Sequence, residues 1–104
     1  MKENRKQIKL ENNIYEIIEN KNDCLNINEL IEKYTDYFYP FDYILGDYAY
    51  NKLRLKGFCN KNNKRYNKIN DISLKEKYLK NQCAYHCNYF LIKKSKGAVS
   101  KLSD

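Results

Sequence analysis

The sequence predicts an α+β protein: a single small domain with a mixed or antiparallel sheet of about five strands and two helices. Three observations lead to this fold class. The chain has 104 residues, which is room for one domain. Short apolar runs of Ile, Leu, Tyr and Phe recur along it with the length of strands. Two other segments repeat apolar residues every three or four positions, which is typical of amphipathic helices.

A β-hairpin is expected near the N-terminus. Apolar runs at residues 8–10 and 14–18 lie on either side of the triplet Glu11-Asn12-Asn13. Asn adopts positive φ more readily than most residues, so the triplet suits a tight turn between two antiparallel strands.

The first helix is expected between this hairpin and Pro40. Asn26 or Asn28 can cap its N-terminus, because a side-chain oxygen accepts a hydrogen bond from the free N–H groups of the first turn. Pro40 is expected to end the helix, since the residue before a proline is pushed away from helical geometry. One apolar face is predicted to carry Ile27, Leu30, Ile31, Tyr34 and Phe38.

The third and fourth strands are expected at residues 41–45 and 53–58. Gly46 and Asp47 lie between them, and we expect these two residues to form a structural turn. Glycine permits backbone angles that other residues avoid, and an aspartate can accept hydrogen bonds from amides two residues on.

The fourth strand alternates apolar and cationic residues. Arg54 and Lys56 should therefore share one face of the sheet, opposite Leu53 and Leu55. Gly57 weakens this strand and indicates a bulge or a close approach of another part of the chain.

The C-terminal part is predicted to hold a polar loop at residues 59–70, the second helix and a fifth strand. Ser73 and Glu76 match a capping box at the start of the helix. Residues 89–92, YFLI, are a continuous apolar run, which suits a strand covered on both faces. The apolar side of the helix is expected to carry Leu74, Tyr78, Leu79 and Cys83.

The two ends of the chain differ from this domain, which is predicted to span residues 7–94. Residues 1–6 form a polar arm, and the Ser-, Lys- and Gly-rich residues 95–104 predict a disordered tail. No signal peptide and no run approaching ~20 apolar residues is present. A cytoplasmic protein with four reduced cysteines is therefore expected.

Two stretches resemble the markers of one family. The first is FDYILGDYAYNKLRLKGF at residues 41–58, and the second is CAYHCNYFLIKK at residues 83–94. Together they resemble the YutD-like family of small bacterial proteins. The chain departs from the family pattern at three positions, which are Tyr48 in place of Trp, Ala49 where Gly is common, and His86 where Gly is usual.

The resemblance implies an α+β fold with a mixed or antiparallel sheet, and it implies no activity. The marker residues that we interpret as structural are Asp42, Gly46, Asp47, Gly57, Cys83 and Cys87.

The positive charge of the chain is concentrated. The formal net charge is +7, and no acidic residue lies between Tyr48 and Asn70. Such a patch attracts polyanions, and Tyr48 and Tyr50 can stack on bases. The candidate nucleic-acid-binding residues are therefore Tyr48, Tyr50, Lys52, Arg54, Lys56, Lys61, Lys64, Arg65 and Lys68.

These residues lead to a first hypothesis, a non-enzymatic module that binds RNA or a ribonucleoprotein surface. The alternative function is a protein-interaction adaptor with an acidic partner, or with one that docks on exposed tyrosines. A structural interpretation stays open beside both, in which the lysines decorate a solvated face and Arg54 pairs with Asp47 or Asp42.

No metal, cofactor or catalytic residue is assigned. Cys83, His86 and Cys87 could hold zinc with Cys24 or Cys59, but a lone Cys-x-x-x-Cys is not the usual spacing. We expect Cys83 and Cys87 to pack as reduced thiols. Asp42, Asp47 and Lys56 loosely match a metal-dependent nuclease, yet Arg54 stands where a metal ligand is needed. An enzyme of an unrecognised class is the third hypothesis.

Overall fold

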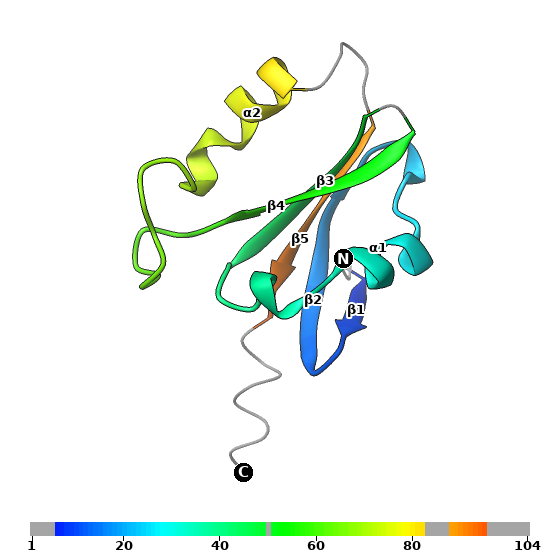
Figure 1. Cartoon of the computed structure of the whole chain (residues 1–104), viewed down its shortest axis with the longest axis horizontal. Helices are drawn as coiled ribbons and strands as arrows, with labels where there is room; N and C mark the ends of the chain where they lie inside the picture. The colour runs from blue at the N-terminus through cyan, green and yellow to red at the C-terminus, as the bar shows by residue number, and fades with distance from the viewer. Residues whose placement is uncertain (1–5, 50, 83–87, 96–104) are drawn as a thin grey trace, which may run out of the picture.

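The structure is a computed structural model that describes residues 6–49, 51–82 and 88–95. Nearly all of the predicted polar arm and tail lies outside these ranges, so the predicted domain limits stay predictions. The described strands are β1 (Gln7–Leu10), β2 (Asn13–Asn20), β3 (Tyr43–Ala49), β4 (Lys52–Phe58) and β5 (Tyr89–Lys94). They form one sheet in the order β1-β2-β5-β3-β4, and every neighbouring pair is antiparallel (Figure 1).

Two helices, α1 (Ile27–Lys33) and α2 (Lys75–Gln82), complete the described fold, together with 3-10 turns. The turns are η1 (Lys21–Asp23), η2 (Asp36–Phe38) and η3 (Ile72–Leu74). The predicted α+β class, with a five-stranded antiparallel sheet and two helices, is confirmed. None of the described helices has the length and apolar character needed to cross a membrane.

The sheet has a core on each face, and each core involves one helix. We call the side that packs with α1 the α1 face, and the side that packs with α2 the α2 face. β5 contributes Phe90 and Ile92 to the α1 face and Leu91 to the α2 face, and all three are buried. The prediction that this strand is covered on both faces is therefore confirmed.

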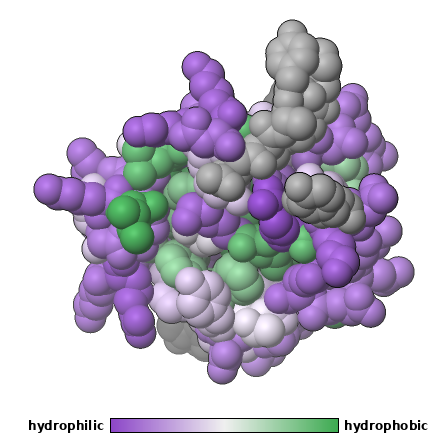
Figure 2. Space-filling view, turned by 45° about the horizontal axis from the view of Figure 1, so that its top comes forward, coloured by the Kyte–Doolittle hydropathy of each residue, from purple (hydrophilic) through white to green (hydrophobic). Residues whose placement is uncertain are grey.

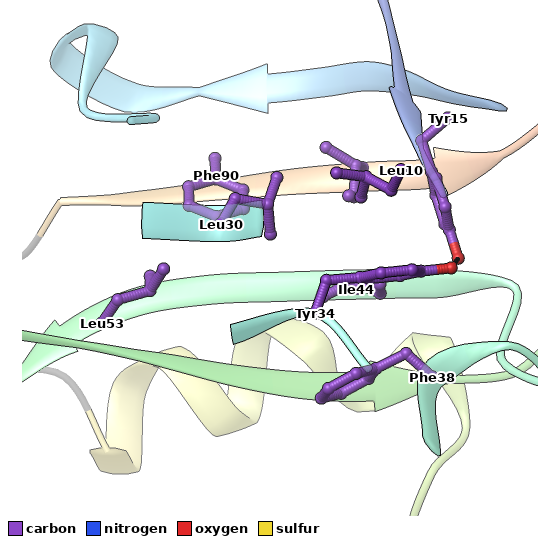
Figure 3. Packing of buried hydrophobic residues seen from close by; sticks show 9 residues of the cluster. Leu10, Tyr15, Leu30, Tyr34, Phe38, Ile44, Leu53 and Phe90 are labelled. Carbon is purple, nitrogen blue, oxygen red and sulfur yellow. Dashed lines mark hydrogen bonds between the residues drawn. The ribbon is translucent and has the colours of Figure 1, made fainter. Parts of the chain in front are cut away.

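The α1 face holds the larger core, in which Tyr15 and Tyr34 meet (Figure 3). Their rings are edge to face with centroids 5.8 Å apart, and their hydroxyl groups are 2.9 Å apart. Asn13 Nδ2 donates to the Tyr34 hydroxyl at 3.0 Å. Each buried hydroxyl thus has a partner, which a buried tyrosine needs.

The first helix differs from its prediction. Asn26 is the cap, since its Oδ1 accepts from Glu29 N at 3.1 Å. The helix ends at Lys33, well before Pro40, because the chain becomes extended at Tyr34 and forms η2 next. Of the predicted apolar face, Leu30, Tyr34 and Phe38 are buried, but Ile27 and Ile31 are exposed.

Three turn or cap predictions were wrong in detail. Gly46 and Asp47 do not form a turn: β3 runs through both, and the next positive φ among the described residues is at Asn51. In the first hairpin the positive φ falls on Glu11 and not on an Asn. The residue that caps the segment leading into α2 is Asp71, whose Oδ1 accepts from Ser73 N at 2.9 Å, and not Ser73.

Candidate binding surface beside strand β4

Arg54 is held by an ion pair within the sheet. It lies directly opposite Asp47 in the β3–β4 register. Its Nε donates to Asp47 Oδ1 at 3.1 Å and its Nη2 to Asp47 Oδ2 at 2.8 Å. The Asp47 side chain is 1% exposed and that of Arg54 is 38% exposed. A buried carboxylate needs such a partner, so Arg54 first of all neutralises Asp47.

Lys56 and Tyr48 also make contacts inside the fold. Lys56 Nζ lies 5.4 Å from the ring centroid of Phe58 and 5.6 Å from that of Tyr78, within cation–π range. The Tyr48 hydroxyl donates to Cys24 O and Glu29 Oε1, each at 3.1 Å. Burial and the hydrogen bond to Glu29 raise the pKa of Tyr48 to about 12. Tyr48 points to the α1 face, so the structure does not bring it together with Arg54 and Lys56.

The remaining candidate cations are exposed. They are Lys52 at the start of β4, and Lys61, Lys64, Arg65 and Lys68 in the loop. Tyr50 lies outside the described residues. These side chains are exposed, whereas Arg54 is ion-paired with Asp47 and Lys56 lies half-buried against Phe58 and Tyr78.

The loop at residues 59–70 is closed by asparagine hydrogen bonds. Asn63 Nδ2 donates to Asp42 Oδ2 at 2.9 Å and to Pro40 O at 2.8 Å, which ties the loop to the start of β3. Asn70 is buried, donates to Arg65 O and accepts from Asn67 N. The family residue Asp42 thus has a visible role in positioning the loop.

The two family glycines lie beneath aromatic rings. A Cβ atom on Gly46 would lie 2.2 Å from Phe90 Cζ, and one on Gly57 would lie 2.4 Å from Phe41 Cγ. Neither glycine has a positive φ. Both are therefore needed for space, and the close approach predicted at Gly57 is that of the Phe41 ring.

The β4 hollow is the surface feature that these contacts create. It has a volume of about 500 Å³ and lies along the middle of β4. A second hollow of about 500 Å³, which reaches Arg65, shares Tyr37 and Phe41 with it. Among the residues that line the β4 hollow are Tyr37, Phe41, Lys56, Gly57, Ile69 and Tyr78.

Exposed apolar side chains stand at this hollow. Tyr37 is 66% exposed and Ile69 is 76% exposed. On the face of the molecule in Figure 2, hydrophobic side chains form patches inside a mainly hydrophilic outline. Sequence reasoning assigned Tyr37, Phe41 and Ile69 no binding role. The one available signal was the density of aromatic residues around Pro40, in YFYPF at residues 37–41.

The predicted zinc and packing roles of the C-terminal cysteines stay predictions. Cys83, His86 and Cys87 lie outside the described residues. Of the other two cysteines, Cys59 is buried and Cys24 is half-buried, and burial raises the pKa of both thiols. A raised pKa keeps a thiol protonated and unreactive at neutral pH.

Comparison with known proteins gives a consistent result. A family model described as "Putative antitoxin YutD-like" matches residues 9–93. The Bacillus subtilis (strain 168) protein named "Putative antitoxin YutD" is 33% identical over 87 residues, which are 84% of this chain and 96% of that protein. The solution NMR structure of protein yutD from B. subtilis matches with a TM-score of 0.74 and 31% identity, over 92% of this chain and 87% of that one.

Proposed function

Since the chain belongs to the YutD-like family, we propose that it is a non-catalytic module that acts by binding a partner protein. The Bacillus relative carries the name "Putative antitoxin YutD", and an antitoxin works through a partner. The description therefore favours binding over catalysis for this chain, and a protein over other classes of partner.

The observation that carries this proposal is the β4 hollow with its exposed Tyr37 and Ile69. Aromatic side chains are enriched at protein interfaces because they give a large contact area at a low entropic cost. Arg54, Lys56 and Tyr48, three of the residues expected to contact RNA, already make contacts within the fold. Of the two hypotheses drawn from the sequence, binding to a protein partner is therefore better supported than binding to RNA.

Affinity capture with and without ribonuclease tests the proposal. The tagged chain is incubated with lysate of its own host, and each captured protein is then purified and mixed with the chain alone. We expect at least one protein to survive ribonuclease treatment and to form a complex of fixed stoichiometry. If every captured protein is lost after ribonuclease treatment, the partner is RNA-dependent and the proposal is wrong.

A second candidate function is RNA binding through the exposed loop cations. The observation that favours it is four exposed cations, and no acid, between Asn60 and Asn70. Fluorescence anisotropy with a single-stranded RNA at two salt concentrations tests it, because phosphate contacts weaken steeply with salt. The matched variant replaces all four cations by Gln and should reduce the salt dependence. Equal binding by the wild type and this variant would contradict the idea. The four cations are Lys61, Lys64, Arg65 and Lys68.

A further inference from the structure

Strand β4 is an edge of the sheet. It pairs with β3 on one side, and no strand in the part of the chain that the structure describes pairs with its other side; an isolated bridge between Cys59 and Asp71 lies one residue beyond the end of β4. The strand order places it at the opposite margin of the sheet from β1. The outward N–H and C=O groups of an edge strand form a template to which another extended chain can hydrogen-bond.

The β4 hollow gives access to this edge. Four consecutive residues of the strand, 54–57, line the hollow, so it is bordered by both faces of β4. The hollow is lined by Tyr37 and Phe41 on the α1 face of the sheet and by Tyr78 on the α2 face. An extended segment beside β4 would therefore place alternate side chains against two different surfaces.

These two surfaces differ in chemistry. The α1 side of the hollow is aromatic and apolar, with Tyr37, Phe41 and Leu55. The α2 side carries Lys56 next to Tyr78, and the exposed Lys52 lies on the same face of β4. A complementary segment has apolar and acidic residues in alternation.

Charge also decides which kind of extended segment can bind beside β4. A second copy would bring its own Lys52 and Lys56 against the same two cations, and like charges across paired strands are destabilising. The segment 96–104 of this chain has two lysines and one aspartate, so it lacks the alternating acidic residues that would complement these cations. An acidic segment of another protein meets neither obstacle.

We propose that the partner protein docks by adding an extended segment, with alternating acidic and apolar residues, to the open edge of β4. This inference rests on the protein-binding function proposed above and specifies how that binding occurs. Backbone hydrogen bonds would supply the affinity, and the two sides of the hollow would select the side-chain pattern.

Synthetic peptides test the mode of binding. The probe is a ten-residue peptide that alternates Glu and Val, and the controls are its Lys and Val counterpart and a peptide with five Glu followed by five Val. We expect the alternating acidic peptide to slow hydrogen exchange of β4 amides, and both controls to bind at least tenfold more weakly. The proposal is overturned if the acidic peptide leaves the exchange of β4 amides unchanged, or if the block peptide binds as well.

A matched pair of variants locates the site. Ile69→Asp puts a negative charge, the same sign as the Glu residues of the peptide, at the rim of the hollow. Ile31→Asp makes the same change at an exposed position on α1, outside the hollow. We expect Ile69→Asp to weaken the acidic peptide at least tenfold and Ile31→Asp to leave its affinity unchanged. Equal effects of the two variants would overturn the proposal, and circular dichroism checks that both are folded.

The same variants distinguish a failure of docking at β4 from a failure of the proposed protein-binding function. If a reconstituted partner protein binds Ile69→Asp as tightly as the wild type, docking at β4 is wrong but the protein-binding function stands. If a ten-nucleotide single-stranded RNA protects the β4 amides and the peptide does not, docking by an acidic protein segment is wrong. If no captured protein survives ribonuclease treatment, both proposals fail.

Discussion

The two faces of the sheet are stabilised by different interactions. The α1 face is an aromatic and aliphatic core in which nine buried residues cluster, and the hydroxyl groups of Tyr15 and Tyr34 bond to each other within it. The α2 face has three buried residues in its cluster, which are Leu45, Phe58 and Leu91. Ion pairs and cation–π contacts surround that smaller core, in particular Arg54 with Asp47.

This difference between the two faces indicates how the charged residues of the sequence should be interpreted. A small core buries less apolar surface, so the α2 face uses charged side chains as part of its structure. Arg54 and Lys56 look like ligand-binding residues in the sequence, yet both have partners within the fold. The cations of the loop at residues 59–70 are different, because they are exposed.

The largest loss of stability is expected on the α1 face, for Gly46→Val. The new Cβ would lie 2.2 Å from the buried Phe90 ring, and the opposing strands cannot separate without breaking the sheet. Overpacking of this kind should cost about 3 kcal/mol or more of the free energy of unfolding, measured in urea. Gly57→Val is the matched control: the half-buried Phe41 ring can move, so its cost should be smaller, about 1 kcal/mol. Equal costs would show that ring mobility does not decide the effect.

The next largest loss of stability is expected when the ion pair between Arg54 and Asp47 on the α2 face is broken. Arg54→Met leaves the buried Asp47 carboxylate without its principal cation, which should cost about 2 kcal/mol once the partial exposure of Arg54 is considered. Adding Asp47→Asn should recover part of the loss, since a neutral amide is less costly to bury than a carboxylate. Chemical denaturation of both variants measures this. A double variant no more stable than Arg54→Met would contradict a charge-based explanation.

The hydroxyl pair on the α1 face should have a smaller effect. Tyr34→Phe removes the group that bonds the fully buried Tyr15 hydroxyl and accepts from Asn13. We expect a loss of about 1.5 kcal/mol, because one buried hydroxyl is left without its partner. The exposed Tyr37→Phe is the control and should change the free energy of unfolding by less than about 0.5 kcal/mol. A comparable loss in both variants would contradict this explanation.

The smallest effect, and the one that depends on pH, concerns Lys75 and Glu19 on the α2 face, whose Nζ and Oε2 are 2.7 Å apart. Burial opposes the ionisation of Glu19, but the hydrogen bonds from Lys75 and Tyr89 and the charge of Lys75 together outweigh it and lower the pKa of Glu19. Burial likewise opposes the charged form of Lys75, and its bonds to Glu19 and Glu76 more than offset this and raise its pKa.

A carboxyl group with a lowered pKa stabilises the fold above its unfolded pKa, and this contribution is lost as the pH falls through the folded pKa. Lys75→Met should therefore cost about 0.5–1 kcal/mol at pH 7 and nearly nothing below about pH 3. Thermal unfolding at several pH values, with the exposed Lys80→Met as control, measures this. A cost that stays constant down to pH 3 would show that Lys75 acts through packing alone.

The strand pattern was predictable because it is local. The order of apolar and polar residues predicts the hairpin at residues 7–20, the alternating apolar and cationic residues of β4, and the burial of β5 on both faces of the sheet. Gly46 was misinterpreted for the same reason. Local preference favours a turn at Gly-Asp, whereas the actual need for glycine comes from Phe90, 44 positions further along the chain.

The sequence by itself determined the fold class, the family markers and the concentration of positive charge between Tyr48 and Asn70. Only the tertiary structure decided which of those charges are exposed, because Arg54 meets Asp47 through strand register and Lys56 meets Tyr78 through the packing of α2. The β4 hollow is also a tertiary feature, formed by segments from four parts of the chain. Such contacts join residues that are distant in sequence, and the period of apolar residues carries information only about neighbours.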